Sequence, residues 1–385
     1  MEWAGDLAGH SNRRPKLPEI HVDRRARLAE LLTYDKLDAA LVTNLTNVHY
    51  LTGLASSNAA LLLTADGAAT LATDGRYATA AADVAADVEL VIERHVAPAL
   101  AVRAAAGTTA ARLGVEEHHL TLESWKSIRR ALDEADGSTE LVDLGRAVEK
   151  LRTTKDDTEI EALTEACAIS CRALEDLYAA GRFVGRTEKE VALDLERRMY
   201  AHGADGIAFE TIVAAGENSA IPHHRPVDRQ IAKGDLLKID FGAIYRGYHA
   251  DCTRTSVVAA EPADWQREIY DIVQAAQRAG RQALVVGEDC LGVDTASRSV
   301  IDAGGYADQF GHGTGHGVGL QVHEAPTLGY SATGTLADRM TVTVEPGIYL
   351  PGRGGVRIED TLVVRAAGVP DLLTPTTKDL LVLDA

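Results

Sequence analysis

Residues 343–360 read TVEPGIYLPGRGGVRIED, and this segment constrains the architecture more strongly than any other. Two apolar runs flank a proline and glycines around Gly352, a pattern that predicts a β-hairpin. In that hairpin, Glu345 and Glu359 fall opposite each other on the paired strands. Like charges that face each other across two strands destabilise a sheet unless something neutralises them. The hairpin therefore points to a bound cation.

A second segment repeats this arrangement. Residues 236–254 read LLKIDFGAIYRGYHADCTR, and we expect the turn at Tyr245-Arg246. With that turn, Asp240 faces Asp251, or lies diagonal to it on the same face if the loop is slightly longer. One such acid alone would be interpreted as a solvated strand residue. Two pairs in apolar strands predict a centre of two divalent cations, which would neutralise all four carboxylates.

Histidines form the third element of the predicted site. Residues 310–326 read FGHGTGHGVGLQVHEAP and contain His312, His316 and His323. The interspersed glycines let the backbone approach a crowded centre, and neutral imidazole is the commonest nitrogen ligand of metals. These glycines do not fit the GxGxxG pattern of a dinucleotide site. His223, in the sequence IPHHRP, is a further candidate for which packing is an equally good interpretation.

The rest of the chain predicts two domains. Residues 1–20 are expected to form a loose tail, residues 21–150 an α/β domain and residues 151–385 an α+β domain. The first domain should contain a hairpin of Ala59–Thr64 and Ala69–Thr73. The second should contain three helices, from residue 157 to Gly181, from Thr187 to Gly203, and from about residue 262 to 287.

Composition excludes several classes of function. Acidic residues outnumber basic ones by 57 to 39, a balance that disfavours nucleic acids and anionic membranes as partners. No apolar run is long enough to span a bilayer, and the first twenty residues lack the apolar segment of a signal peptide. Four cysteines without a CxxC pattern fit a reducing cytoplasm.

The order Asp, Asp, His, Glu, Glu, with the motifs quoted above, resembles the pita-bread metallopeptidases of peptidase family M24B. That group includes methionine aminopeptidase, aminopeptidase P and prolidase. Residues 47–53 and 73–77 are similar to the first domain of prolidase-like and creatinase-like members, which methionine aminopeptidases lack. The resemblance covers the chain from about residue 24. It implies a creatinase/prolidase-like N-terminal domain, a pita-bread catalytic domain, and the activity of a bacterial Xaa-Pro dipeptidase.

Specific roles follow from this resemblance. It implies that a dinuclear metal site is held by Asp240, Asp251, His316, Glu345 and Glu359. His223 and His323 match the histidines that handle the substrate and the developing oxyanion. His312 matches a position at the mouth of the substrate pocket, and Arg357 matches an arginine beside the ligands. Glu345 is also expected to carry the proton from water to the departing proline nitrogen.

The cofactor and the partners are expected from the same resemblance. Four oxygen donors and one imidazole favour a fairly hard ion, with Mn²⁺ as the first choice and Co²⁺ or Zn²⁺ as substitutes. A hydroxide that bridges the two ions is expected to attack the carbonyl carbon before proline. The substrate is a small Xaa-Pro peptide, and the expected assembly is a cytoplasmic homodimer.

Two alternatives stay open. An aminopeptidase P would use the same chemistry but release the first residue from longer peptides. A protein that keeps the fold without turnover would use it only for binding. A dipeptidase also needs a cation that reads the proline carboxylate, and the sequence does not choose among Arg225, Arg353 and Arg357.

Overall fold

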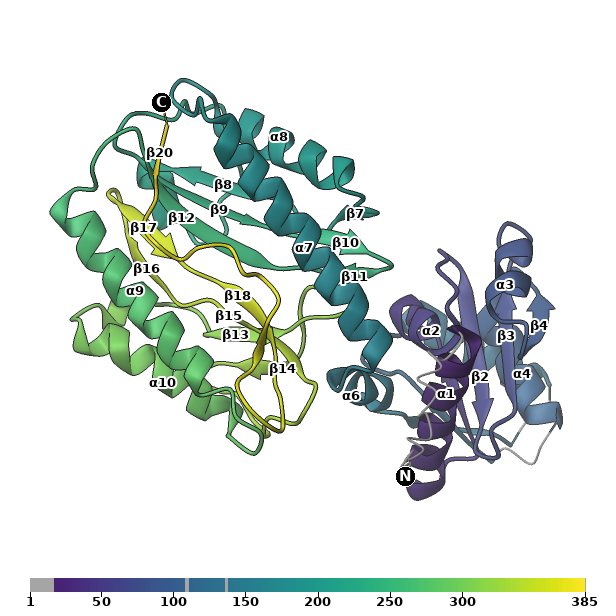
Figure 1. Cartoon of the computed structure of the whole chain (residues 1–385). Coiled ribbons are helices and arrows are strands. Elements are labelled where there is room, and N and C mark those ends of the chain that lie inside the picture. Colours follow the sequence, from purple (N-terminus) through teal and green to yellow (C-terminus); the bar gives the residue numbers. More distant parts are fainter. Residues whose placement is uncertain (1–16, 108–110, 136–137, 385) are drawn as a thin grey trace, which may run out of the picture. The chain divides into compact units, whose positions relative to one another are not determined.

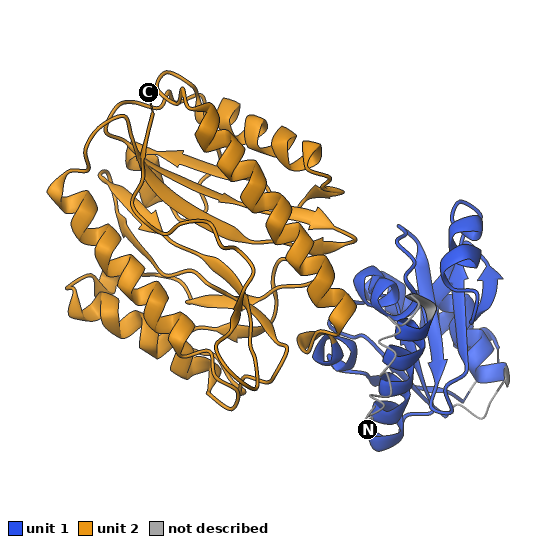
Figure 2. Cartoon of the chain, viewed as in Figure 1, with its two compact units in different colours: residues 1–151 blue, residues 152–385 orange. Residues whose placement is uncertain are grey.

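The computed structural model describes residues 17–107, 111–135 and 138–384. Residues 1–16 of the predicted tail lie outside these ranges, and residues 17–20 are the start of a helix rather than part of a loose tail. The chain divides into two compact units, Met1–Leu151 and Arg152–Ala385 (Figure 2). The first is α/β and the second α+β, so the predicted fold class of each is confirmed.

The N-terminal unit is built on one mixed sheet with the strand order β4-β3-β2-β1-β5-β6 (Figure 1). The strands are β1 (Ala39–Val42), β2 (Ala59–Thr64), β3 (Ala69–Thr73), β4 (Glu89–Ile92), β5 (Arg112–Val115) and β6 (Glu140–Asp143). Strand β2 pairs antiparallel with β1 and with β3, which confirms the predicted hairpin, and the other pairs are parallel.

Helices cover both faces of this sheet. The helices that begin in this unit are α1 (Leu17–Tyr34), α2 (Leu45–Thr52), α3 (Ala78–Val84), α4 (Val96–Gly107), α5 (Leu122–Glu134) and α6 (Ala147–Thr153). Alternate strand residues such as Leu41 and Leu62 pack on α4 and α5 in one apolar cluster. Their neighbours Leu61 and Leu63, also buried, point to the other face, where α1 and α2 contact the strands.

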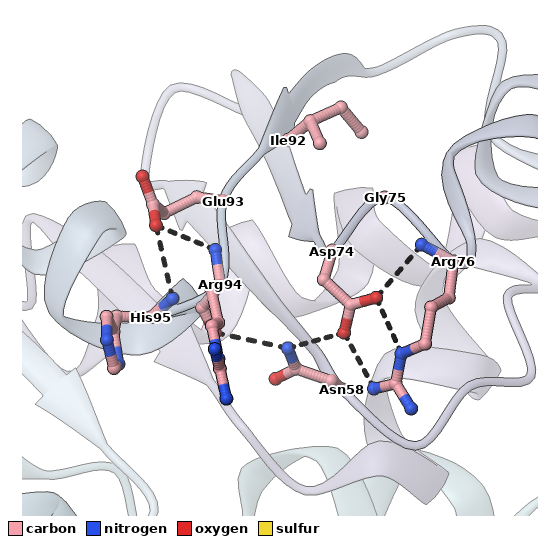
Figure 3. A pocket seen from close by; sticks show the side chains of 8 residues that line it. All are labelled: Asn58, Asp74, Gly75, Arg76, Ile92, Glu93, Arg94 and His95. Carbon is pink, nitrogen blue, oxygen red and sulfur yellow. Dashed lines mark hydrogen bonds and ion pairs between the residues drawn. The ribbon is translucent and has the colours of Figure 1, made fainter.

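The N-terminal unit also has a pocket of about 640 Å³, which Figure 3 shows. Asp74 accepts hydrogen bonds from Nε and Nη2 of Arg76 at 2.9 and 2.8 Å, and from Nδ2 of Asn58 at 2.8 Å. Asn58 also donates to the backbone oxygen of Arg94. These bonds, chiefly those from the Arg76 side chain, lower the pKa of Asp74. The polar groups therefore tie together the loops that follow β3 and β4.

The C-terminal unit places strands between two pairs of helices (Figure 1). The helices are α7 (Asp157–Ala180), α8 (Glu188–Ala201), α9 (Asp264–Gln282) and α10 (Cys290–Ala303). Asp156 and Thr187 begin α7 and α8, each with a reciprocal capping box, and Gly181 ends α7, as predicted. Helices α7 and α8 share one apolar cluster with β8, β9 and β12. Helix α9 packs against the strands that carry Ile348 and Val356.

The strands of this unit form several small sheets. A four-stranded sheet has the order β20-β12-β9-β8, and a five-stranded sheet has the order β14-β13-β15-β18-β19. Two smaller sheets are β11-β10-β7 and β16-β17. The strands are β7 (Gly206–Ile207), β8 (Ile212–Ala215), β9 (Leu236–Phe241), β10 (Ala243–Tyr245), β11 (Tyr248–His249), β12 (Cys252–Val258), β13 (Gly315–Gly317), β14 (Glu324–Leu328), β15 (Thr341–Val344), β16 (Gly347–Leu350), β17 (Gly354–Arg357), β18 (Asp360–Val363), β19 (Asp371–Leu372) and β20 (Val382–Leu383).

The third predicted helix needs correction. It spans Asp264–Gln282 rather than residues 262 to 287, and Gly287, with a positive φ of 89°, lies in the turn that leads to α10. Helix α10 itself was not expected from the sequence. Its buried face includes the polar residues Asp294 and Ser297, which weaken the apolar periodicity. In the part of the chain that is described, no helix is long and apolar enough to cross a membrane.

Candidate metal centre

The first pair of acids comes from the β9–β12 ladder. Asp240 on β9 pairs with Thr253, and Asp251 lies two residues before Thr253. The two aspartates are therefore diagonal neighbours on one face, which confirms the second of the two predicted registers. The predicted turn at Tyr245-Arg246 is wrong by one residue. Arg246 and Gly247 form the turn, with φ values of 51° and 82°, because a two-residue hairpin turn favours positive φ at both positions.

The second pair of acids lies where two ladders join. Gly347 pairs with Arg357 in the β16–β17 ladder, and Val344 pairs with Asp360 in the β15–β18 ladder. The second ladder continues the pairing of the first without a shift. Glu345, which follows Val344, therefore lies opposite Glu359, which precedes Asp360. The predicted facing of these two acids is confirmed.

Backbone hydrogen bonds at this junction bring the segments together. The amide of Glu345 donates to the oxygen of Thr314 at 2.7 Å, and the amide of Glu359 donates to the oxygen of Thr253 at 3.1 Å. Thr314 precedes the His316 strand, and Thr253 belongs to the strand that follows Asp251. Each glutamate is thus tied by its own backbone to another part of the site.

His316 lies on β13 between two glycines at which a side chain would collide with a neighbouring strand. A Cβ atom on Gly315 would lie 2.1 Å from the backbone oxygen of Thr343, and one on Gly317 would lie 2.2 Å from that of Ala325. His316 Nδ1 donates to the oxygen of Gly317 at 3.0 Å. Its Nε2 atom therefore presents a lone pair to the carboxylates.

These side chains meet in one cavity. His316 Nε2 lies 3.6 Å from Asp251 Oδ2 and 3.4 Å from Glu345 Oε1. Donor atoms of Asp251, His316 and Glu359 all lie within 4.8 Å of one another. The cavity, of about 280 Å³, is lined by Asp240, Asp251, His316, Glu345 and Glu359, by His223, His224, Arg225 and His323, and by Phe209, Glu210, Ile212 and Val322.

Burial raises the pKa of three carboxyl groups of the site, those of Asp251, Glu345 and Glu359. Desolvation, followed by repulsion from the neighbouring acids, raises the pKa of Asp251 and of Glu359 well above the ordinary range. Desolvation raises the pKa of Glu345 to about 8, although Arg357 opposes the shift. Desolvation also lowers the pKa of His316 to about 4 and keeps its imidazole neutral. These groups stabilise one another only if positive charge is added.

The donor set fits divalent cations. Asp240 Oδ1 is buried and accepts no hydrogen bond from any described residue. Its other oxygen is held by Arg357, so Oδ1 is the atom left to bind a ligand. Thr253 donates to Glu359 Oε2 at 2.7 Å and orients that carboxylate. Four carboxylates and one neutral imidazole are the ligands that fairly hard divalent ions take.

Arg357 and His312 belong to a buried network beside the cavity, and neither lines it. Arg357 pairs with Asp240 and donates through Nη1 to the hydroxyl of Tyr349 at 2.9 Å. Tyr349 lies 2.8 Å from His312 Nε2, and His312 Nδ1 donates to the oxygen of Gly313. Burial lowers the pKa of His312 to about 3. The role of His312 in substrate binding stays a prediction.

Tyr349 is a site residue that the sequence reasoning missed. It lies four residues after Glu345, so strand alternation could have placed both on one face. The two other predicted histidines do line the cavity. The ring of His323 meets that of His316 edge-on, with 4.4 Å between centroids, and burial lowers the pKa of His323.

Comparisons with known proteins agree with this architecture. The model of metallopeptidase family M24 matches residues 161–366, and that of the creatinase/prolidase N-terminal domain matches residues 24–154. An uncharacterised peptidase of Bacillus subtilis is 39% identical over 90% of this chain and 96% of its own length. The Xaa-Pro dipeptidase of Pyrococcus horikoshii is 31% identical over 94% of this chain and 100% of its own.

Solved structures show the same likeness over nearly the whole chain. An Xaa-Pro dipeptidase from Bacillus anthracis has a TM-score of 0.89 and 36% identity, covering 94% of this chain and 100% of that one. An X-Pro aminopeptidase from Thermotoga maritima has a TM-score of 0.84 and 33% identity, covering 93% of this chain and 99% of that one.

Proposed function

This chain belongs to metallopeptidase family M24, and from that premise we propose that it hydrolyses Xaa-Pro dipeptides at a centre of two divalent metal ions. The observation that carries the proposal is the convergence of four carboxylates and one imidazole, from three separate segments, on one cavity. Relatives named Xaa-Pro dipeptidase, with similarity over nearly the whole chain, supply the reaction.

The ions are assigned to the five converging side chains, Asp240, Asp251, His316, Glu345 and Glu359. Divalent ions, when bound, lower the pKa of water and polarise the scissile carbonyl. Mn²⁺ is our choice because the donors are mostly carboxylate oxygens, and Co²⁺ or Zn²⁺ would substitute.

The chain's own residues handle protons and developing charge. We assign Glu345 to accept a proton from the attacking water on its carboxylate and to pass it to the proline nitrogen as the peptide bond breaks. His223 and His323, on the wall of the cavity, donate imidazole N–H bonds to the carbonyl oxygen as negative charge develops there. Arg357 holds Asp240 in place through their buried ion pair.

Substrate recognition is assigned to the remaining part of the wall. Phe209, Ile212 and Val322 offer apolar surface to a pyrrolidine ring, which has no N–H to donate once it is acylated. Among the described residues, Arg225 is the one guanidinium or ammonium group that lines the cavity, and we assign it to the substrate carboxylate. It is exposed and paired with Glu210 at 3.0 Å, a contact that the substrate carboxylate would replace.

The two other arginines considered for this role are engaged elsewhere. Arg357 is fully buried and bonds to Asp240, Tyr349 and Thr253. Arg353 stacks on the ring of Trp265, 4.3 Å from its centroid, and does not line the cavity. These contacts favour Arg225 and, with it, a dipeptidase.

One experiment tests the function directly. Protein stripped of metal and resupplied with Mn²⁺ is incubated with Leu-Pro and, separately, with Leu-Pro-Ala, and the released leucine is followed by mass spectrometry. We expect cleavage of Leu-Pro. Cleavage of the tripeptide in preference would indicate an aminopeptidase P. Metal binding without cleavage of either peptide would indicate a binding protein.

We also propose that the chain forms a cytoplasmic homodimer. The dimer rests on the family resemblance, and light scattering should then give twice the chain mass of 41.0 kDa. The location rests on four free, buried cysteines, which fit a reducing compartment.

A further inference from the structure

The loop that carries His223 is not held by regular secondary structure. It connects the short 3₁₀ helix Gly216–Ala220 to the segment before β9. Pro222 and Pro226 lack an amide hydrogen. Among the described residues, none from 222 to 227 forms a backbone–backbone hydrogen bond. Something else must fix the position of His223 on the cavity wall.

Glu188, the first residue of α8, binds both ends of this loop. Its Oε1 atom accepts bonds from the amide of Ala215 at 2.8 Å and from Nδ2 of Asn218 at 2.9 Å. Its Oε2 atom accepts bonds from Nε2 of His224 at 2.7 Å and from the amide of Val227 at 3.1 Å. The Glu188 side chain is fully buried, so these four donors replace its hydration.

Lys238 on β9 binds the start of the loop and the end of the 3₁₀ helix before it. Its Nζ atom donates to the backbone oxygens of Ser219 at 3.0 Å, Ile221 at 2.7 Å and Pro222 at 3.4 Å. Lys238 is completely buried, and no carboxylate of the described residues forms an ion pair with it. Arg357 donates a further bond to the oxygen of Pro222 at 3.1 Å.

Burying the charges of Glu188 and Lys238 costs free energy, and all the hydrogen bonds described above for these two side chains go to the His223 loop and the residues just before it. An apolar side chain at position 238 would pack between strands without desolvating an ammonium group. We propose that Glu188 and Lys238 are positioning residues that hold His223 at the reaction centre. Lys238 fixes the residue before His223, and Glu188 fixes the residue after it. This inference rests on the proposed role of His223.

The test uses the full-length, Mn²⁺-loaded enzyme with two nearly isosteric variants, Glu188→Gln and Lys238→Met. Matched controls are Glu217→Gln, in the 3₁₀ helix before the loop, and Lys233→Met, before β9, because both native side chains are exposed. We expect each test variant to lower kcat for Leu-Pro by about 10–10²-fold with metal content unchanged, since small displacements of a reacting group have effects of this size. The controls should stay near wild type.

A double-mutant cycle separates positioning from a general loss of structure. In the His223→Ala background, Glu188→Gln and Lys238→Met should each lower kcat by less than about 3-fold, because residues that act as a unit are not additive. Losses that multiply fully in the double variants would overturn the proposal. Loss of metal from Lys238→Met would also contradict it, since the lysine would then act through Asp240.

A second readout does not depend on activity. Amide hydrogen exchange in peptides that span residues 216–227 should be faster in both test variants than in wild type and in the controls. Unchanged exchange would contradict the anchoring of the loop. If the wild-type enzyme cleaves neither Leu-Pro nor Leu-Pro-Ala, the proposed function fails, while the exchange experiment still decides whether Glu188 and Lys238 hold this loop.

Discussion

Single hydrogen bonds determine which atoms of the site are available. The bond from His316 Nδ1 to Gly317 leaves Nε2 as an acceptor, and the bond from Arg357 to Asp240 Oδ2 leaves Oδ1 free for a ligand. The residue types were evident from the sequence. Which atom of each residue faces the cavity was not, because partners such as Arg357 and Asp240 are far apart along the chain.

His323 is expected to stabilise charge without binding metal. His323→Ala should keep its metal content and lower kcat by about 10²–10³-fold, the usual effect of removing one oxyanion donor. Steady-state kinetics and elemental analysis on the same preparation check both parts. His119→Ala, at an exposed histidine of the N-terminal unit, is the control. Near-native turnover of the His323 variant would remove this residue from the mechanism.

Arg225 is expected to recognise the substrate carboxylate. Arg225→Met should raise KM for Leu-Pro about tenfold, since a charge-assisted hydrogen bond is lost, and should leave KM for Leu-Pro amide unchanged. Arg353→Met, which alters an arginine outside the cavity, should change neither value. Equal effects of Arg225→Met on acid and amide would rule out a carboxylate contact.

The strands on either side of His316 lie so close to β13 that no side chain fits at Gly315. Gly315→Ala would push β13 away from β15, because a Cβ atom there would lie 2.1 Å from the oxygen of Thr343. We expect metal content and activity to fall together by at least about tenfold. Gly311→Ala, where a Cβ atom meets nothing within 4 Å, should resemble wild type. Normal metal binding by the Gly315 variant would show that the strands can move apart.

Element prediction succeeded where short-range chemistry sets the structure. Apolar spacing predicted α7, a capping box marked the start of α8, and the register of the hairpin in residues 343–360 followed from its turn. It failed at α10, whose buried Asp294 is satisfied by Arg298 and by Thr314. Because a buried polar residue with such a partner interrupts the apolar spacing of its helix, the local sequence does not show the helical pattern.

The stability of the whole molecule should depend on pH and on metal in a linked way. In metal-free protein, the pKa of Glu345 is raised from 4.5 to about 8, so the folded chain holds a proton that the unfolded chain releases. The stability that the bound proton on Glu345 gives to the folded chain is fully present below pH 4.5, and it is lost as pH rises towards and through 8. His312 and His316, whose pKa values are lowered from 6.5, contribute the opposite slope only below that pH.

The informative window is therefore pH 6.5 to 8. Glu345 should remove about 1–2 kcal/mol of stability from the metal-free protein across this range, and Asp251 and Glu359 act in the same direction, so Tm should fall in thermal unfolding. Saturating Mn²⁺ displaces the proton and should flatten the profile. Glu345→Gln should make the metal-free profile less steep without flattening it, because the pKa values of Asp251 and Glu359 stay raised. A metal-free profile that rises with pH in this window would contradict the assignment.

The sequence was sufficient for the fold class, for the two pairs of neighbouring acids and for singling out the glycine-rich segment 310–326 that carries His316. Each of these depends on residues within about twenty positions of one another, where turn chemistry and strand alternation set the geometry. The assignment of the metal ligands and of the catalytic histidines stays a prediction that these segments support.

The assembly of the site depended on long-range packing. The amides of Glu345 and Glu359 bind Thr314 and Thr253, which joins two hairpins and the His316 strand. Glu188 and Lys238 hold the His223 loop from two different elements. No local pattern encodes such contacts, because segments separated by long connections meet only when the apolar clusters on either side of the strands form.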